Sequence, residues 1–158
     1  MTDNKKDYGY ELLKLSNQVC FPLYACAKEI IRQYSPMLKK LDLTYTQYIV
    51  MMVLWEKNSI GSRDLAKNLH LDYGTLTPFL KKMEQNGFIK KEKNSVDERL
   101  LTITLTEKGK SLRDQAVEIP MKMAGCVGLA REELEVLYKL TYKALANMEQ
   151  RDLTTLKN

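Results

Sequence analysis

The segment from residue 62 to residue 106 carries the pattern that most limits the fold: two helices in close succession, then two short strands. SRDLAKNLH predicts a short helix, and TLTPFLKKMEQNG predicts a second one, capped by Asp72 or Thr75 and closed by Gly87. FIKKEK and RLLTITLT follow as strands, the second with alternating apolar and threonine side chains. A helix pair followed by a two-stranded ribbon is the layout of a winged helix-turn-helix.

Helical periodicity also precedes this segment. Residues 10–41 carry an apolar stripe that Pro22 interrupts, so either the helix bends there or a helix starts near Pro22 with Cys20 just ahead of it. The tripeptide YSP at 34–36 predicts a break, because a residue before proline avoids the helical region. Thr44 and Gln47 have capping-box spacing and predict a helix that ends near residue 58, before a turn at SIGS.

Two long helices are predicted after the ribbon. Thr106 caps the first, which runs through EKGKSLRDQAVEIPMKMAG, and AREELEVLYKLTYKALANME forms a final amphipathic helix. The predicted fold class is therefore mainly α with a small β-hairpin wing. The helices at both ends carry apolar faces with little to cover them, which predicts pairing with a second subunit. We expect a single domain, residues 1–158, in which dimerisation helices at 10–43 and 107–150 flank a DNA-binding region at 44–106.

The composition narrows the class of protein. The chain has 158 residues, of which 44% are hydrophobic and 28% charged, so we expect a folded protein. It has no apolar run of membrane-spanning length, and its polar N-terminus lacks the apolar core of a signal peptide, which predicts a cytoplasmic protein without membrane contact. Three widely spaced cysteines and one histidine argue against a disulfide framework and a zinc site, and we expect no metal or other cofactor. The net charge of +5 permits a nucleic-acid partner.

The second helix of the pair has the side chains that a recognition helix needs. Tyr73, Thr75 and Thr77 lie near its start, where such a helix meets base edges in the major groove. Lys81 and Lys82 follow and are placed for phosphates. The alternative is an ordinary solvated helix.

The turn between the two predicted strands supplies a second set of DNA contacts. Asp97 and Arg99 lie at its tip, where an arginine can enter a narrow minor groove and an aspartate can hold the guanidinium in place. The alternative is a solvated salt bridge in a turn, which contributes little.

Several stretches of the chain closely resemble the MarR family of dimeric winged-helix regulators: LTYTQYIVMMVLWE, LDYGTLTPFLKKMEQNGFI and DERLLTITLTEKG. NQVCFPLY, together with LTYTQY, resembles the organic-hydroperoxide-resistance branch of that family. The resemblance covers about Leu15 to Met148. One departure is Pro22, where an aliphatic residue is expected inside the helix.

The resemblance implies a peroxide-reactive thiol. Cys20 matches the reactive cysteine of the branch, which hydrogen-bonds to two tyrosines of the partner subunit. Tyr34 and Tyr45 match that tyrosine pair, and Tyr24 matches a further tyrosine near the same pocket. The thiolate is the nucleophile in such chemistry, and phenol donors favour it.

The other two cysteines have different expected roles. Some family members carry a second cysteine after the wing, which forms a disulfide with the reactive cysteine of the other subunit, and Cys126 falls in that region. Other members use a small external thiol, and both alternatives stay open. Cys26 lacks tyrosine partners and is interpreted as a packing residue.

These features predict a homodimeric repressor that binds a pseudo-palindromic double-stranded DNA operator and releases it when an organic hydroperoxide oxidises Cys20. A second hypothesis is a MarR-type regulator gated by a small phenolic or aromatic ligand in the cleft between the DNA-binding and dimer regions, which the Tyr- and Met-rich helices would line. A thiol peroxidase is disfavoured, because no arginine or threonine that would activate a peroxide lies close to Cys20 in the sequence. A helical interaction module leaves the wing unexplained.

The predicted wing gives a first test. We expect Arg99→Ala to weaken operator binding by about 1–3 kcal/mol without dissociating the dimer, because a minor-groove arginine is lost. Titration of labelled operator at physiological salt measures the loss, and an unchanged affinity would contradict the assignment.

Overall fold

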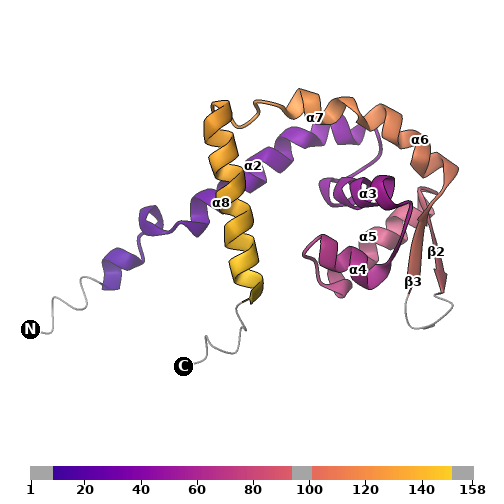
Figure 1. The fold of residues 1–158 in the computed structure, drawn as a ribbon, viewed down its shortest axis with the longest axis horizontal. Coiled ribbons are helices and arrows are strands. Elements are labelled where there is room, and N and C mark those ends of the chain that lie inside the picture. The colour runs from indigo at the N-terminus through magenta and orange to yellow at the C-terminus, as the bar shows by residue number, and fades with distance from the viewer. Residues whose placement is uncertain (1–8, 94–100, 151–158) are drawn as a thin grey trace, which may run out of the picture. The chain divides into compact units, whose positions relative to one another are not determined.

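A computed structural model of the chain describes residues 9–93 and 101–150. The chain divides into two compact units, Met1–Met123 and Ala124–Asn158, which are described separately below. The first unit holds the helix-turn-helix and the sheet, and the second holds one long helix, α8 (Figure 1). Within the described ranges, no helix combines the length and the apolar character needed to cross a membrane.

Of the two alternatives expected for the N-terminal region, the structure supports a helix that starts near Pro22, with Cys20 as its first residue. A short 3-10 helix, Leu15–Asn17, precedes α2, Cys20–Lys39, so the helix begins at Cys20 itself. Pro22 is tolerated because the first N–H groups of a helix have no intrahelical partner. The expected break at YSP is wrong, since α2 continues through Pro36. A proline so near the helix end removes one backbone hydrogen bond, while continuing the helix buries Leu38.

The helix-turn-helix lies where the sequence predicts it. Its helices are α3 (Tyr45–Lys57), α4 (Ser62–Asn68) and α5 (Tyr73–Gln85). The predicted capping box of α3 is confirmed: Thr44 accepts a hydrogen bond from the Gln47 amide at 3.3 Å, and Gln47 Oε1 accepts from the Thr44 amide at 2.8 Å. The fully buried side chains of this region come from all three helices and the sheet, and include Met51, Leu54, Leu65, Leu76, Met83, Ile89 and Ile103.

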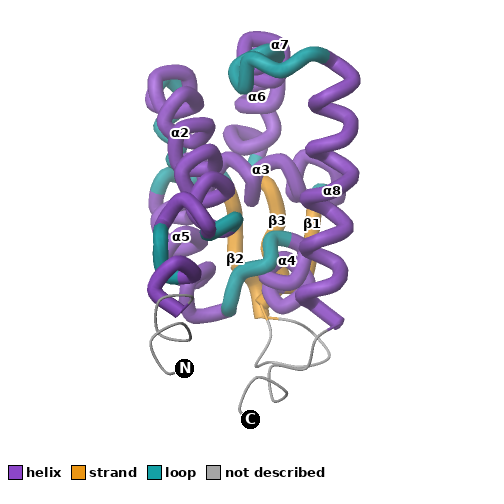
Figure 2. Tube along the Cα trace, turned by 90° about the vertical axis from the view of Figure 1, so that its left-hand side faces the viewer, coloured by secondary structure: helices purple, strands orange, loops and turns teal. Residues whose placement is uncertain are grey.

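The wing contains one strand more than predicted. The strands β1 (Ser59–Gly61), β2 (Ile89–Lys93) and β3 (Leu101–Leu105) form an antiparallel sheet in the order β1-β3-β2 (Figure 2). The turn expected at SIGS is therefore wrong. Ile60 pairs with Ile103 and is buried, and burial of this side chain favours a third strand over an exposed turn.

The helical region after the sheet is also divided differently. The single long helix expected after Thr106 is two helices, α6 (Glu107–Ala116) and α7 (Glu118–Met123), with Val117 between them. Pro120 explains the break, because it has no N–H to donate to the carbonyl of Ala116. In the second unit, α8 (Arg131–Gln150) matches the predicted final helix, and none of its residues is buried.

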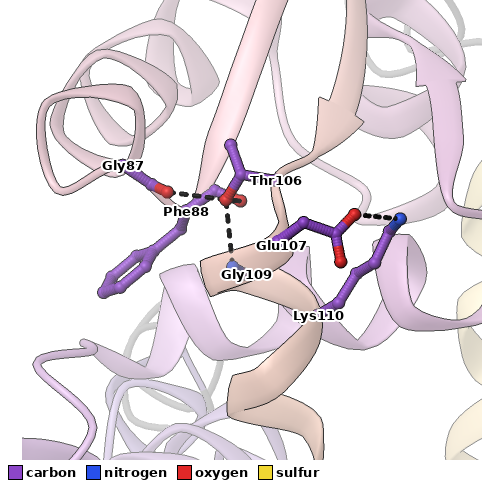
Figure 3. Close-up of polar contacts among 6 residues, drawn as sticks. All are labelled: Gly87, Phe88, Thr106, Glu107, Gly109 and Lys110. Atoms are coloured by element: carbon purple, nitrogen blue, oxygen red, sulfur yellow. Dashed lines mark hydrogen bonds and ion pairs between the residues drawn. The ribbon is translucent and has the colours of Figure 1, made fainter.

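The first turn of α6 is anchored to the end of the recognition helix (Figure 3). The Thr106 hydroxyl lies 2.6 Å from the carbonyl oxygen of Gly87 and accepts from the Gly109 amide at 3.0 Å. The backbones are so close that a Cβ atom built on Gly109 would lie 2.1 Å from the carbonyl oxygen of Phe88. Only glycine fits this contact without movement of the backbone.

This contact generates a stability prediction. We expect Gly109→Ala to lower the free energy of unfolding by about 1–3 kcal/mol, because the added methyl group overpacks a backbone contact. Gly9→Ala is the matched control, since a Cβ there meets nothing within 4 Å. Urea denaturation of both variants measures the difference. Equal stability of the Gly109→Ala protein and the parent would contradict the close approach.

Candidate nucleic-acid interface and thiol site

The N-terminus of the recognition helix α5 is fixed by a side-chain cap. Asp72 Oδ1 accepts from the Thr75 amide at 2.8 Å, and Asp72 Oδ2 accepts from the Thr75 hydroxyl. These hydrogen bonds, the hydroxyl one first, lower the pKa of Asp72. The carboxylate therefore stays charged at neutral pH and holds the first turn of α5, which is the turn expected to meet base edges.

The two recognition threonines have their hydroxyl protons engaged within the helix. The Thr75 hydroxyl donates to Asp72, and the Thr77 hydroxyl donates to the Tyr73 carbonyl at 2.8 Å. Both side chains are exposed. What remains for DNA is an acceptor oxygen and a methyl group on each. These suit the amino groups of cytosine or adenine and the methyl group of thymine.

The two lysines of α5 are exposed, and neither forms an ion pair with another described residue. Successive helical residues point about 100° apart, so Lys81 lies on the flank of Thr77 and Lys82 on the flank of Thr75. Lys82 also lines a hollow of about 270 Å³ with Lys39 and with Thr44, at the start of α3. Seen down the helix axis, both lysines lie within the arc between Thr77 and Thr75, so the exposed cations and the positions expected to meet bases share one side of α5.

The predicted wing-tip residues, Asp97 and Arg99, lie outside the described residues. On the strand that leads toward them, Lys90 is exposed. Lys91 instead pairs with Glu84 of α5, with 2.8 Å between Nζ and Oε2. This ion pair ties the wing strand to the recognition helix.

The structure brings the predicted tyrosine pair together. The rings of Tyr34 and Tyr45 meet edge to face with centroids 5.1 Å apart, and Tyr48 joins them 5.9 Å from Tyr34. Burial raises the pKa of Tyr45. Burial, and then the repulsion that an ionised Tyr45 would exert, raise the pKa of Tyr48. Both phenols are therefore protonated at neutral pH and can donate hydrogen bonds. Tyr48 was not among the sequence-predicted site residues.

Cys20 is not part of this cluster in the single chain. It is the first residue of α2, whereas Tyr34 lies 14 residues further along the same helix. At 1.5 Å per residue the two Cα atoms are about 21 Å apart. Cys20 is exposed, as are its neighbours Phe21 and Tyr24. In a single chain, therefore, the Cys20 thiol and the Tyr34–Tyr45 pair lie far apart.

The other cysteines are free as well. Cys26 is exposed, so it does not pack into the core of a single chain. Cys126 is partly exposed in the second unit, in a turn between Gly125 and Gly128, which both have positive φ. A Gly128 amide bond to the Gly125 carbonyl, at 2.9 Å, closes that turn.

A cavity lies between α3 and α6–α7. Its volume is about 300 Å³, and Tyr48, Trp55 and Val117 contribute apolar walls. Glu56 and Arg113 add two opposite charges to the lining. Trp55 also donates from Nε1 to the Gly109 carbonyl at 2.9 Å. The stripe of Tyr48, Met52 and Trp55 along α3 is the sequence signal that could have revealed this wall.

Comparison with known proteins defines the class of the chain. A family model described as transcriptional regulator SarA/Rot matches residues 32–116. Together with the winged helix-turn-helix, this match shows that the chain belongs to the MarR/SarA family of DNA-binding transcriptional regulators. Its relatives are regulators and not enzymes.

Particular relatives narrow the similarity. The organic hydroperoxide resistance transcriptional regulator of Bacillus subtilis is 41% identical over 95% of this chain and 99% of its own. The regulator SarZ of Staphylococcus aureus is 37% identical over 87% of this chain and 94% of its own. The structure of reduced AbfR bound to DNA is 32% identical with a TM-score of 0.72, covering 89% of this chain and 99% of that chain, and AbfR of Staphylococcus epidermidis has also been solved. AbfR has also been solved with a disulfide, at 30% identity and a TM-score of 0.60 over 92% of this chain and 99% of that chain.

The geometry of α5 yields a prediction with two contrasting outcomes. We expect Lys81→Gln and Lys82→Gln to weaken binding to operator and random DNA alike, and to lower the salt slope by about 0.9 per lost phosphate contact. Thr77→Val should instead change base preference, because it removes the acceptor oxygen but keeps the shape. Binding measured at several salt concentrations separates the two effects. A lysine variant with altered base preference and an unchanged salt slope would contradict the assignment.

Proposed function

We propose that this regulator is a homodimeric repressor that senses organic hydroperoxides through Cys20 and releases its operator when that thiol is oxidised. The observation that carries the proposal is the separation of thiol and tyrosines along α2. Because Tyr34 lies about 21 Å from Cys20 in its own chain, the pair can meet this thiol only from a second copy. The similarity to the B. subtilis hydroperoxide regulator over nearly the whole chain supports the same reading.

The exposed apolar surface supports the dimer. On α2, Phe21, Leu23 and Ile31 are exposed, and on α8 no residue is buried. Tyr138 and Tyr142 stack on the surface of α8 with centroids 4.7 Å apart. Amphipathic helices of this kind gain stability when a partner covers them.

The chemistry at Cys20 is a two-electron oxidation. The thiolate attacks the terminal oxygen of the hydroperoxide, and the O–O bond breaks. The sulfur becomes a sulfenic acid, and the leaving alkoxide takes up a proton to become the alcohol. Tyr34 and Tyr45 of a second copy donate to the thiolate, and apolar side chains such as Phe21 favour an organic peroxide over a small polar one.

The release step follows from the position of Tyr45, the first residue of α3. Helix α3 packs against both α4 and α5. A sulfenic acid or a disulfide is bulkier and more polar than the thiol, so it breaks the tyrosine contacts and shifts α3. The distance between the two recognition helices of the dimer then no longer matches the DNA repeat.

The fate of the sulfenic acid has two alternatives. Cys126 of the second copy can resolve it to a disulfide, and the glycines beside Cys126 suit a mobile resolving thiol. A disulfide has been solved in the related AbfR. The other route is a mixed disulfide with a small external thiol. A linked dimer on a non-reducing gel, absent from Cys126→Ser, distinguishes the first route from the second.

A second candidate function has one specific observation in its favour. The cavity of about 300 Å³ beside Trp55 combines apolar walls with Arg113, which forms no ion pair with another described residue. A phenolic acid fits this lining, because its carboxylate can pair with Arg113 and its hydroxyl can donate to Glu56, and its binding would gate DNA affinity without any change at Cys20.

The deciding experiment uses Cys20→Ser with Cys26→Ser as the matched control, because both thiols lie exposed on α2. Both variants are expected to bind operator like the parent. After one equivalent of cumene hydroperoxide, the parent and Cys26→Ser should lose at least about tenfold in affinity and recover with dithiothreitol, whereas Cys20→Ser should not respond. Release of DNA by oxidised Cys20→Ser would contradict the redox mechanism. Release by an aromatic acid alone would favour the second candidate.

A further inference from the structure

Three consecutive carbonyl groups at the end of the recognition helix are bound by the start of α6. The Asn86 carbonyl accepts from Lys108 Nζ at 2.8 Å, and the Phe88 carbonyl accepts from the Thr106 amide at 3.1 Å. The Gly87 carbonyl between them faces the Thr106 hydroxyl at 2.6 Å (Figure 3). Lys108 Nζ also lies 4.9 Å from the centre of the Phe88 ring. The direction of α5 is therefore tied to the first turn of α6.

One side chain from a third helix completes this junction. Trp55, near the end of α3, donates its indole N–H to the Gly109 carbonyl at 2.9 Å. Gly109 is also the residue whose backbone lies against Phe88, where no Cβ can be added. Trp55 thus holds α3 to the point at which α6 meets the end of the recognition helix.

The same face of α3 leads back to the tyrosines. Tyr45, Tyr48, Met52 and Trp55 recur at spacings of three and four residues, which places them on one side of the helix. The Tyr48 and Trp55 rings meet edge to face with centroids 6.1 Å apart, and Tyr48 contacts Tyr34. The packed chain from Tyr34 to the Gly109 carbonyl is therefore continuous, and packed chains of this kind can carry energetic coupling between two sites.

We propose that Trp55 is a positioning residue for DNA recognition. Its hydrogen bond to Gly109 fixes the junction of α5 and α6 to α3 and so sets the orientation of the recognition helix α5. The proposal rests on the homodimer, since a dimer reads two half-sites at a fixed separation. It does not depend on the oxidation of Cys20. Trp55 itself is not proposed to contact a base.

The test uses the reduced protein and operators selected from random duplexes by the parent. The separation of the two half-sites is then increased or decreased by single base pairs. The parent should bind one separation best. Trp55→Phe, which keeps an aromatic ring but loses the N–H, should lose about 3- to 10-fold at that separation, and its penalty for the altered separations should shrink.

A change that only destabilises the protein would not flatten this profile of affinity against half-site separation. Ile119→Val removes one buried methyl group from α7 without touching the junction, and it should keep the parental profile even where stability falls. If Trp55→Phe does not fold, 3-benzothienylalanine at position 55 replaces only the N–H by sulfur and should give the same flattened profile. A parental profile in the variant that lacks the N–H would overturn the proposal. A parent without any preference for separation would overturn both this proposal and the dimer.

Discussion

The close approach of Gly109 to Phe88 is the contact on which the DNA-binding unit depends. It brings the start of α6 close enough to supply donors to the carbonyls of Asn86, Gly87 and Phe88, the three residues that connect α5 to β2. The recognition helix, the wing and the helix that follows the wing therefore meet at one hydrogen-bonded junction. A rearrangement of α6 cannot leave the direction of α5 unchanged.

A second constraint comes from the length of α2. A straight helix of 20 residues carries the thiol at one end and Tyr34 about two-thirds of the way along it. The tyrosine cluster of each chain has protonated phenols and no cysteine beside them. In the proposed sensor a second copy supplies Cys20, so that dimerisation and sensing would depend on the same contact.

Sequence reasoning succeeded where local rules determine structure. Capping at Thr44, Asp72 and Thr106 placed the first residues of α3, α5 and α6 correctly, because a cap is a contact between neighbours. It failed where contacts between residues far apart in the sequence determine the structure. The strand at Ile60 and the continuation of α2 through Pro36 both depend on such tertiary packing. The tyrosine pair was predicted from resemblance, and the place of Tyr48 in the cluster was not predicted. The Trp55–Gly109 hydrogen bond joins residues 54 apart and has no local signal.

The central claim is that Cys20 of one subunit reacts inside the tyrosine cluster of the other. A mixed dimer tests it: one chain carries Cys20→Ser, and the other carries Tyr34→Phe with Tyr45→Phe. If the site spans two subunits, the remaining Cys20 faces an unaltered pair and should be oxidised by cumene hydroperoxide at the parental rate. If each site lies within one chain, the remaining Cys20 belongs to the chain whose tyrosine pair is altered. Oxidation at the slow rate of the tyrosine double variant would contradict the shared site.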